Sequence, residues 1–305
     1  MSGSGHGKRA IFAAFAANLG IAVAKFIGFL LTRSSSLLAE SVHSLADTGN
    51  QGLLLLGDHR ARRAPDASHP FGYGRERYFW AFVVALVLFI GGAAFAIYEG
   101  ITKIRHPHAI ESAPIAIGIL LVAMVLEGGS FATAVKEASS ARRGRSLVRY
   151  IRESRAPELP VVLLEDAGAL IGLILALGGV VLSVTTGNPV FDGVSTLCIG
   201  LLLGVIAITL AVEMKSLLIG ESALVEDNDA IERVLADDPK VEAVIHLRTQ
   251  HLGPEDLLVA AKLAFDPALT LPELALAIDA AEVRVRAEVP TVRLIYIEPD
   301  LHRNR

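Results

Sequence analysis

The sequence predicts an α-helical membrane protein with six transmembrane helices, followed by a C-terminal cytoplasmic α/β domain. Hydrophobic residues make up 52% of the 305 residues and charged residues only 20%. The mean hydropathy is +0.51, which is too apolar for an ordinary soluble domain. Long apolar runs lie before residue 215, and short runs between charged residues follow it. We therefore expect a membrane domain over residues 1–215 and a soluble domain over residues 216–305.

Six apolar runs are long enough to cross a bilayer, which takes about 20 helical residues. They lie near residues 10–32, 36–57, 79–102, 113–135, 160–185 and 190–213. A secretory signal peptide is the alternative interpretation of the first run. That run is longer than the apolar region of a typical signal peptide, and no convincing cleavage site ends it.

The basic residues predict the orientation of these spans. Lys8 and Arg9 precede the first span, five arginines lie between Arg60 and Arg77, and seven basic residues lie between Lys136 and Arg155. The opposite connections hold only Arg33, Lys103 and Arg105. Because cytoplasmic loops carry the excess of Lys and Arg, we expect both termini in the cytoplasm and the protein in the cell (inner) membrane.

The soluble part predicts the order helix, strand, strand, helix, strand. "NDAIERVLADD" has a helical apolar period, with Asn228 or Asp227 as its N-cap. "VEAVIHLRTQ" and "EDLLVAAKLAFD" read as strands joined around Gly253 and Pro254, and "LPELALAIDAAEVRVRAEV" and "TVRLIYIE" add a helix and a strand. This αββαβ order predicts a compact sheet with helices on one face.

A polar stripe interrupts the second span, "SVHSLADTGNQ". His43 and Asp47 are four residues apart and Asp47 and Asn50 three, so on a helix the three side chains share one face. Polar groups inside a membrane are costly and usually line an ion or proton path. The alternative is a satisfied cluster of interhelical hydrogen bonds.

A second acidic pair lies in the fifth span, where "VVLLEDAGALIG" contains Glu165 and Asp166. Carboxylates and a histidine buried together need a balancing cation. Histidine and carboxylate ligands suit zinc and its first-row neighbours. We therefore expect a divalent metal ion at a site formed by His43, Asp47, Asn50, Glu165 and Asp166, and no resident cofactor.

Further polar residues fall in or near the spans, namely Asn18, Lys25, Glu99 and Glu127. Lys25 and Glu99 are expected to form interhelical pairs or to extend to the membrane interface. For Glu127, lining the path and a packing role remain equal alternatives.

At these residues the chain resembles the cation diffusion facilitator family. "NLGIAVAKFIGFLLTRSSSLLAESVHSLADTGNQ" resembles the family's first two spans, and "SHPFGYGRERYFWAFVVAL" the connection into the third. The resemblance implies a homodimeric Zn²⁺/H⁺ antiporter that works by alternating access, with a ferredoxin-like cytoplasmic dimerisation domain. It implies a transporter and not an enzyme, whose partners are a second copy, metal ions, protons and the lipid bilayer, with no nucleic acid.

The resemblance also implies roles for individual residues of the transport site. His43, Asp47 and Asp166 match the family's ligands, but the position that usually holds a fourth ligand is Val162. On a helical wheel Glu165 lies about 60° from Val162, at about 100° per residue, so we expect Glu165 to supply that ligand. Asn50 or water is the alternative.

Two outer sites are matched only in part. Asp66 and His69 match a peripheral metal site seen in parts of the family, but its third position is Tyr73. In the soluble domain His246 matches a family ligand, whereas the positions that would complete a binuclear site are Ala261, Tyr296 and Glu298. We expect His246 to be a partly buried strand residue.

Two other functions remain open within the sequence. One is an exporter of Mn²⁺ or Fe²⁺, because one histidine among several oxygen ligands is not clearly selective for zinc. The other is an intramembrane metalloenzyme. The sequence contains neither H-E-x-x-H nor G-x-S-x-G, which disfavours the enzyme.

Overall fold

The computed structural model describes residues 4–141, 144 and 146–301. Arg142, Arg143 and Arg145, three of the basic residues expected in the cytoplasm, lie outside the described residues. The chain divides into two compact units. The first, helical unit comprises Met1–Gly57, Trp80–Arg152 and Glu158–Met214, and the second unit comprises Asp58–Phe79, Glu153–Pro157 and Lys215–Arg305.

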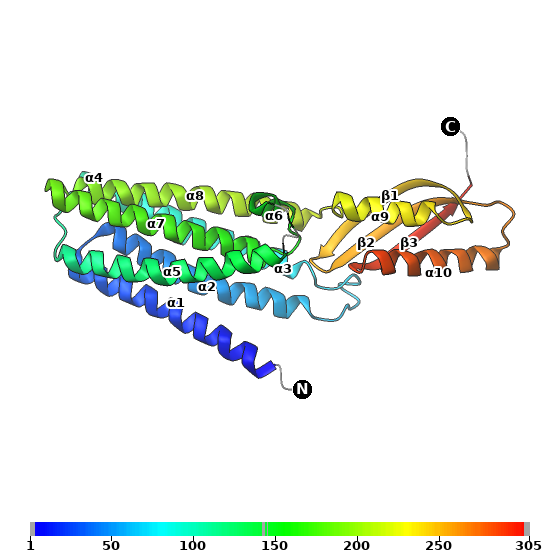
Figure 1. The fold of residues 1–305 in the computed structure, drawn as a ribbon, viewed down its shortest axis with the longest axis horizontal. Coiled ribbons are helices and arrows are strands. Elements are labelled where there is room, and N and C mark those ends of the chain that lie inside the picture. Colours follow the sequence, from blue (N-terminus) through cyan, green and yellow to red (C-terminus); the bar gives the residue numbers. More distant parts are fainter. Residues whose placement is uncertain (1–3, 142–143, 145, 302–305) are drawn as a thin grey trace. The chain divides into compact units, whose positions relative to one another are not determined.

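Long helices occupy all six predicted spans (Figure 1). They are α1 (Ser4–Thr32), α2 (Ser35–Ala61), the continuous run α3 (Glu76–Val87), η1 (Leu88–Ala94) and α4 (Phe95–Arg105), α5 (Ala113–Ala141), α7 (Glu158–Thr186) and α8 (Val190–Ile219). Among the described residues, four are long and apolar enough to cross a membrane: Glu76–Arg105, Ala113–Ser139, Glu158–Thr186 and Val190–Ile219. These helices confirm the predicted membrane protein.

Two local features of the helical unit were not predicted. The third span becomes a π-helix over η1, a rare geometry that is frequent at functional sites. A short helix, α6 (Leu147–Glu153), lies in the connection between the fourth and fifth spans.

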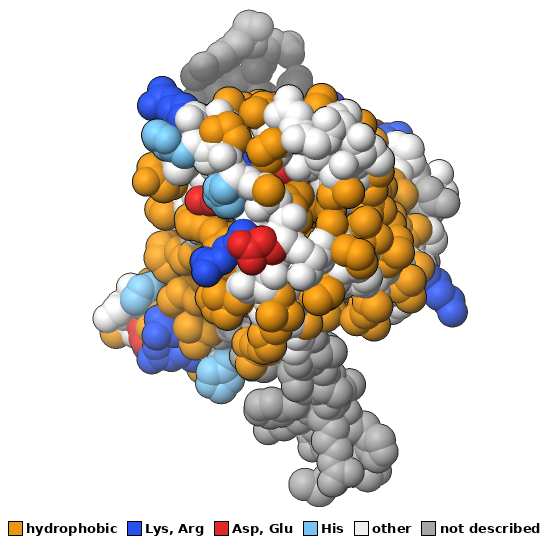
Figure 2. All heavy atoms as spheres, turned by 90° about the vertical axis from the view of Figure 1, so that its left-hand side faces the viewer, with side chains coloured by type: hydrophobic (Ala, Val, Ile, Leu, Met, Phe, Trp, Pro, Cys, Tyr) orange, Lys and Arg blue, Asp and Glu red, His pale blue; other side chains and the backbone are white. Residues whose placement is uncertain are grey.

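The outer surface of the helical unit is hydrophobic, as a lipid-facing surface must be. Val125 of α5 and Ile90 of η1, for example, are 75% and 67% exposed. Figure 2 shows one end of this unit, where hydrophobic side chains dominate and charged ones are few. The apolar runs therefore supply both the hydrophobic outer surface of the helical unit and the packing between its helices.

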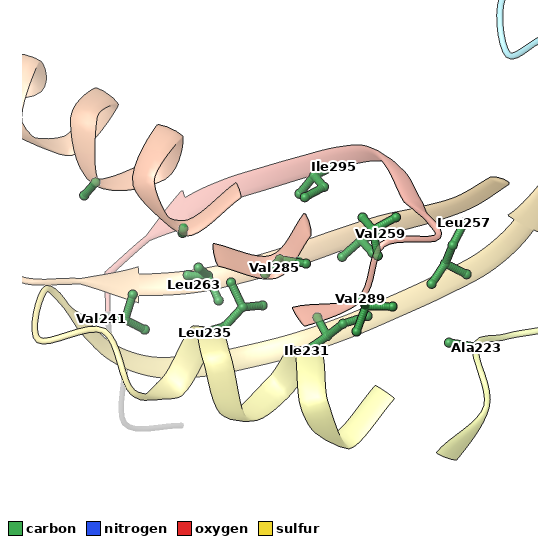
Figure 3. Packing of buried hydrophobic residues seen from close by; sticks show 14 of the residues in the cluster. Ala223, Ile231, Leu235, Val241, Leu257, Val259, Leu263, Val285, Val289 and Ile295 are labelled. Carbon is green, nitrogen blue, oxygen red and sulfur yellow. The ribbon is translucent and has the colours of Figure 1, made fainter. Parts of the chain in front are cut away.

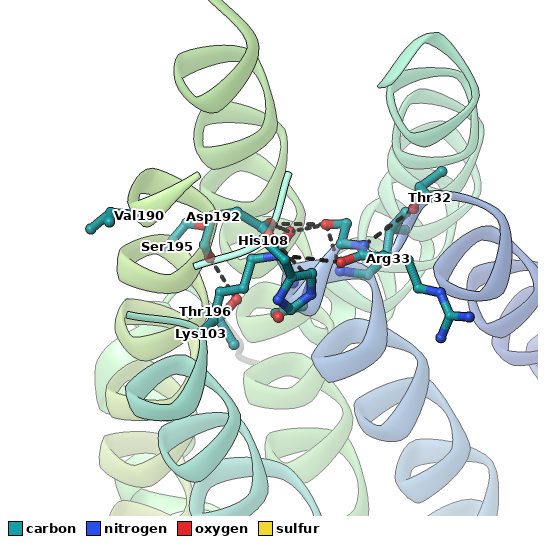
Figure 4. Close-up of polar contacts among 12 residues, drawn as sticks. Thr32, Arg33, Lys103, His108, Val190, Asp192, Ser195 and Thr196 are labelled. Carbon is teal, nitrogen blue, oxygen red and sulfur yellow. Dashed lines mark hydrogen bonds and ion pairs between the residues drawn. The ribbon is translucent and has the colours of Figure 1, made fainter. Parts of the chain in front are cut away.

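A buried ion pair joins three helices at one end of this unit (Figure 4). Asp192 of α8 lies 3.7 Å from Nζ of Lys103, and both side chains are fully buried. The same carboxylate accepts hydrogen bonds from the backbone N–H of Ser35 and the hydroxyl of Ser36, so it caps the N-terminus of α2. Lys103, expected in a connection, is thus a buried residue of α4.

Close packing of α4 on α8 depends on glycine. A Cβ on Gly100 would lie 2.6 Å from the backbone N of Leu197, and one on Gly200 would lie 2.7 Å from the backbone N of Ile97. Small residues at such crossings let membrane helices approach closely.

The second unit contains the predicted αββαβ order, which is confirmed. Its elements are α9 (Val225–Ala236), β1 (Val241–Gly253), β2 (Asp256–Phe265), α10 (Leu271–Glu288) and β3 (Val292–Asp300). The central strand β2 pairs antiparallel with β1 and parallel with β3. Both helices contribute to one core with the sheet, through residues such as Ile231, Leu235 and Val285 (Figure 3).

The predicted N-cap of α9 is wrong. The cap is Leu224, which makes no side-chain hydrogen bond, and the helix begins at Val225. Asn228 lies inside the first turn, where its side chain accepts a hydrogen bond from Thr249 of β1 instead. By contrast, α10 begins with a capping box of Thr270 and Glu273.

Candidate metal site

A small cavity lies inside the helical unit where α1, α2, α5 and α7 meet. Its volume of about 10 Å³ is near the smallest that holds one water molecule. Its lining is polar except for one residue and consists of Asn18, Ser44, Asp47, Gln51, Glu127, Val162, Glu165 and Asp166. Four carboxylates from three helices therefore surround a space of atomic size.

Three of the five predicted site residues line this cavity: Asp47, Glu165 and Asp166. The other two adjoin it through these carboxylates. Nε2 of His43 lies 3.5 Å from Oδ2 of Asp47, and Nδ2 of Asn50 donates a 2.6 Å hydrogen bond to Oε1 of Glu165. Packing of α2 beside α7 thus brings together two polar stretches more than 100 positions apart.

The ring of His43 is buried, and its two nitrogens are polar atoms that need partners. The residue is 1% exposed, and neither ring nitrogen has a hydrogen-bond partner among the described residues. Leaving buried polar atoms unpaired costs free energy, and such atoms call for a functional explanation. The ring lies beside Gly92 of the π-helical segment, where a side chain would approach Nδ1.

The carboxylates of α7 are held by neighbouring helices. Glu165 is 4% exposed and is fixed by Asn50, whereas Oδ2 of Asp166 accepts a 2.9 Å hydrogen bond from the hydroxyl of Ser130 on α5. In this conformation the predicted ligands are not assembled around one point. Among the described residues no three His, Cys, Asp or Glu side chains are spaced to hold a metal ion together.

Two residues given less weight in the sequence belong to this region. Glu127 lines the cavity. Nζ of Lys25 lies 3.6 Å from Oε1 of Glu127 and 3.2 Å from Oε2 of Glu40. The sequence contains a signal that could have identified Glu40. This residue precedes Ser44 by four positions and so continues the polar stripe of α2. Glu99 accepts a hydrogen bond from Ser35 on α2, so Lys25 and Glu99 both form interhelical contacts.

A groove of about 460 Å³ adjoins the cavity between α5 and α7. Its lining consists of Gly129, Ser130, Thr133, Ala134, Glu137, Glu158, Leu159 and Val162. Val162 lines both spaces. The position that lacks the expected ligand is therefore shared by the groove and the carboxylate cavity.

The candidate peripheral residues Asp66 and His69 lie in a tightly bonded loop. Oδ1 of Asp66 accepts hydrogen bonds from the backbone N–H of Ser68 and His69, and Oδ2 accepts one from the Tyr73 hydroxyl. The bond from Tyr73 is the main reason why the pKa of Asp66 is lowered. The His69 ring lies against the ring of Tyr73. These contacts give Asp66 a structural role, and a metal site here remains a prediction.

His246 lies in a strand, as expected, but it is exposed and not partly buried. It follows a register irregularity between Val244 and His246 and stands opposite Lys262 on β2. The Lys262 ammonium binds Glu298 and Asp300. Alanine at position 261 has no ligand atom, and Glu298 is paired with the Lys262 ammonium.

Two family models match the chain. The first, described as the cation efflux transmembrane domain, matches residues 11–219, and the second, described as the cation efflux protein cytoplasmic domain, matches residues 224–300. Together the two matches extend over most of the chain.

Three curated relatives are similar to the chain. The mitochondrial proton-coupled zinc antiporter SLC30A9 of Homo sapiens is 36% identical over 244 residues, which cover 79% of this chain and 43% of the relative. Metal tolerance protein C4 of Arabidopsis thaliana is 31% identical over an alignment that covers 86% of this chain and 58% of the relative. Magnetosome protein MamB of Magnetospirillum gryphiswaldense is 26% identical, with 92% of this chain and 89% of the relative aligned. The chain thus spans less than two thirds of the length of the first two relatives.

Proposed function

Because the chain belongs to the cation efflux family, we propose that it exports Zn²⁺ across a membrane in exchange for protons. The family is one of transporters and not of enzymes, so the metalloenzyme alternative is set aside. The observation that carries the proposal is the cavity lined by Asp47, Glu127, Glu165 and Asp166.

Charge balance inside the cavity favours a divalent ion. Several carboxylates packed together in a low-dielectric region need protons or cations to offset their mutual repulsion. Carboxylates bind such an ion at about 2 Å, so these side chains have to converge on the cavity to hold it. His43 supports the choice of zinc, since its buried ring nitrogens make no hydrogen bond within the described residues and imidazole is a common zinc ligand.

Proton exchange follows from the same ligand chemistry. Carboxylates and imidazole bind metal only when deprotonated, so arrival of the ion releases protons and protonation releases the ion. The groove between α5 and α7 is the route that we propose for ions arriving from the cytoplasm, with both termini on that side. The site closes by small movements of α2 against α7 that bring His43, Asp47, Glu165 and Asp166 around the metal.

Selectivity among divalent metals depends on the types of ligand in the site. The human relative is a proton-coupled zinc antiporter, whereas the proposed ligand set of this chain holds a single histidine. Oxygen-rich sites also bind Mn²⁺ and Fe²⁺. Export of Mn²⁺ or Fe²⁺ is therefore the second candidate function.

We further propose that the protein works as a homodimer in the cell (inner) membrane, joined through the domain 216–305. The outer face of α10 supports this assignment. Leu276 and Val283 are seven residues apart, share one face of the helix and are 65% and 66% exposed. An exposed apolar stripe on a soluble domain is typical of an interaction surface.

The test is metal flux into proteoliposomes that contain the full-length chain and a metal-sensitive dye. We expect Zn²⁺ uptake that depends on a pH gradient and that Mn²⁺ and Fe²⁺ inhibit only weakly. Asp47→Ala should abolish the flux. The control is Asp58→Ala, which removes a carboxylate from the same helix. Asp58 pairs with the exposed Arg62 and does not line the cavity. Equal flux in Asp47→Ala and the parent would refute the site assignment.

A further inference from the structure

A buried ion network lies beside the cavity and has no role in the transport scheme so far. Its centre is Lys25 of α1, whose side chain is 0% exposed. Nζ of Lys25 donates a 2.7 Å hydrogen bond to Oγ of Ser44 and lies 3.2 Å from Oε2 of Glu40. It also lies 3.6 Å from Oε1 of Glu127.

Glu127 belongs to both the network and the cavity. Its carboxylate faces Lys25 and, at the same time, lines the space that holds the candidate ligands. A metal ion in that space and the Lys25 ammonium therefore act on the same carboxylate. Two cations near each other in a low-dielectric interior repel far more strongly than they would in water.

The ammonium is fixed in this place by its other partners. Glu40 packs directly against Gly172 of α7, where even a Cβ atom would collide with the carboxylate. Ser44 belongs to α2 and lines the cavity. Since α1, α2, α5 and α7 all contribute to the arrangement, Lys25 cannot move away from an arriving ion without disrupting interhelical contacts.

We propose that Lys25 is a tethered counter-cation that balances Glu127 in the metal-free state and lowers the affinity of the cavity for the transported dication. Its function is release: an exporter whose carboxylates held the ion without such competition would empty slowly. Lys25 is thus a positioning residue that acts on the metal through Glu127. The inference rests on the proposed transport function and adds a determinant of its affinity.

The competing explanation is a purely structural ion pair, and the chain offers a matched control for it. Lys103 is also fully buried and lies 3.7 Å from Asp192. Neither residue lines the cavity or contacts a residue that does so in any described interaction. Loss of either lysine should lower stability, but only loss of Lys25 should change metal affinity.

The experiment measures Zn²⁺ affinity of the purified full-length protein by competition with a chromophoric chelator, together with flux in proteoliposomes. For Lys25→Gln we expect about tenfold tighter Zn²⁺ binding and a lower maximal flux. Lys25→Arg, which keeps the charge, should resemble the parent. Lys103→Gln should lower the thermal unfolding temperature and leave Zn²⁺ affinity unchanged.

If Lys25 has only a structural role, Lys25→Gln should weaken Zn²⁺ binding, because the substitution loosens the site. Unchanged or weaker Zn²⁺ binding in Lys25→Gln, with a parent protein that binds and transports Zn²⁺, overturns the inference and leaves the proposed function intact. A parent that neither binds nor transports Zn²⁺ refutes both. If Lys25→Gln does not fold, Lys25→Gln combined with Glu40→Gln removes the ion pair as a whole and is held to the same expectation.

Discussion

The side-chain amide of Asn50 donates a hydrogen bond to Oε1 of Glu165 across 2.6 Å, which joins α2 to α7 beside the carboxylate cavity. The contact explains how Glu165 can be buried and still line the cavity. One carboxylate oxygen is fixed by this neutral donor, and Glu165 also lines the cavity. This relationship leads to the first two predictions.

Glu165→Gln should weaken Zn²⁺ affinity by about 100-fold, because a charged ligand is worth several kcal/mol more than a neutral amide in a buried site. The amide oxygen of the new side chain can still accept the bond from Asn50, so the fold should persist. Chelator competition measures the affinity, and thermal unfolding checks the fold. Binding equal to that of the parent would mean that Asn50 or water completes the metal shell.

Val162→His in the Glu165→Gln background should restore about tenfold of the lost Zn²⁺ affinity. Val162 lines the cavity, and an imidazole there supplies the ligand that this position lacks. Val162→Leu in the same background is the control, since it fills the space without a ligand atom. A histidine variant that binds no better than the leucine variant would contradict the expected direction of this side chain.

The double substitution Asp66→Ala with His69→Ala should leave Zn²⁺ flux and bound metal unchanged. The oxygens of Asp66 already accept three hydrogen bonds from its own loop, so we expect faster proteolysis of residues 64–75 and no loss of transport. Tyr73→Phe removes one of these bonds and should loosen the loop less. A fall in bound metal per chain would show that the peripheral site is real.

The second unit should lose stability as pH falls, because burial lowers the pKa of His251. The unfolded chain binds a proton near the ordinary pKa of about 6.5, while the folded state resists protonation. Stability is therefore full above about pH 6.5 and decreases as the pH falls through that value. Thermal unfolding at about pH 7.5 and pH 5.5 should differ less in His251→Gln than in the parent. An equal pH dependence in both proteins would exclude His251 as its origin.

Zinc should have little effect on self-association of the protein. His246 is exposed and stands opposite Lys262, and a cation at that position disfavours a metal ion. Sedimentation velocity in detergent, with Zn²⁺ and with a chelator, should give the same distribution of oligomers. A zinc-dependent dimer that His246→Ala abolishes would reverse this view of the domain.

The sequence by itself determined the class of the protein and the positions of its elements. Run length predicts the spans because a bilayer has a fixed thickness, and periods of two and 3.6 residues predict the αββαβ order. The ionisable residues of α2 and α7 could be recognised because charge inside a membrane needs a purpose. All these signals lie within about 20 neighbouring residues.

Only the tertiary structure decided which polar groups meet. Helical periodicity tells which residues share a face, but not which helix that face meets, so the contacts of Asn50 with Glu165 and of Lys25 with Glu127 depend on the packing of the bundle. The same limit applies to Lys103, which finds Asp192 on a distant helix. In the sheet, two register irregularities, between Val241 and Ala243 and between Val244 and His246, precede His246 and shift its pairing with β2. Alternation along a strand cannot predict such a shift, because it arises from pairing with the neighbouring strand.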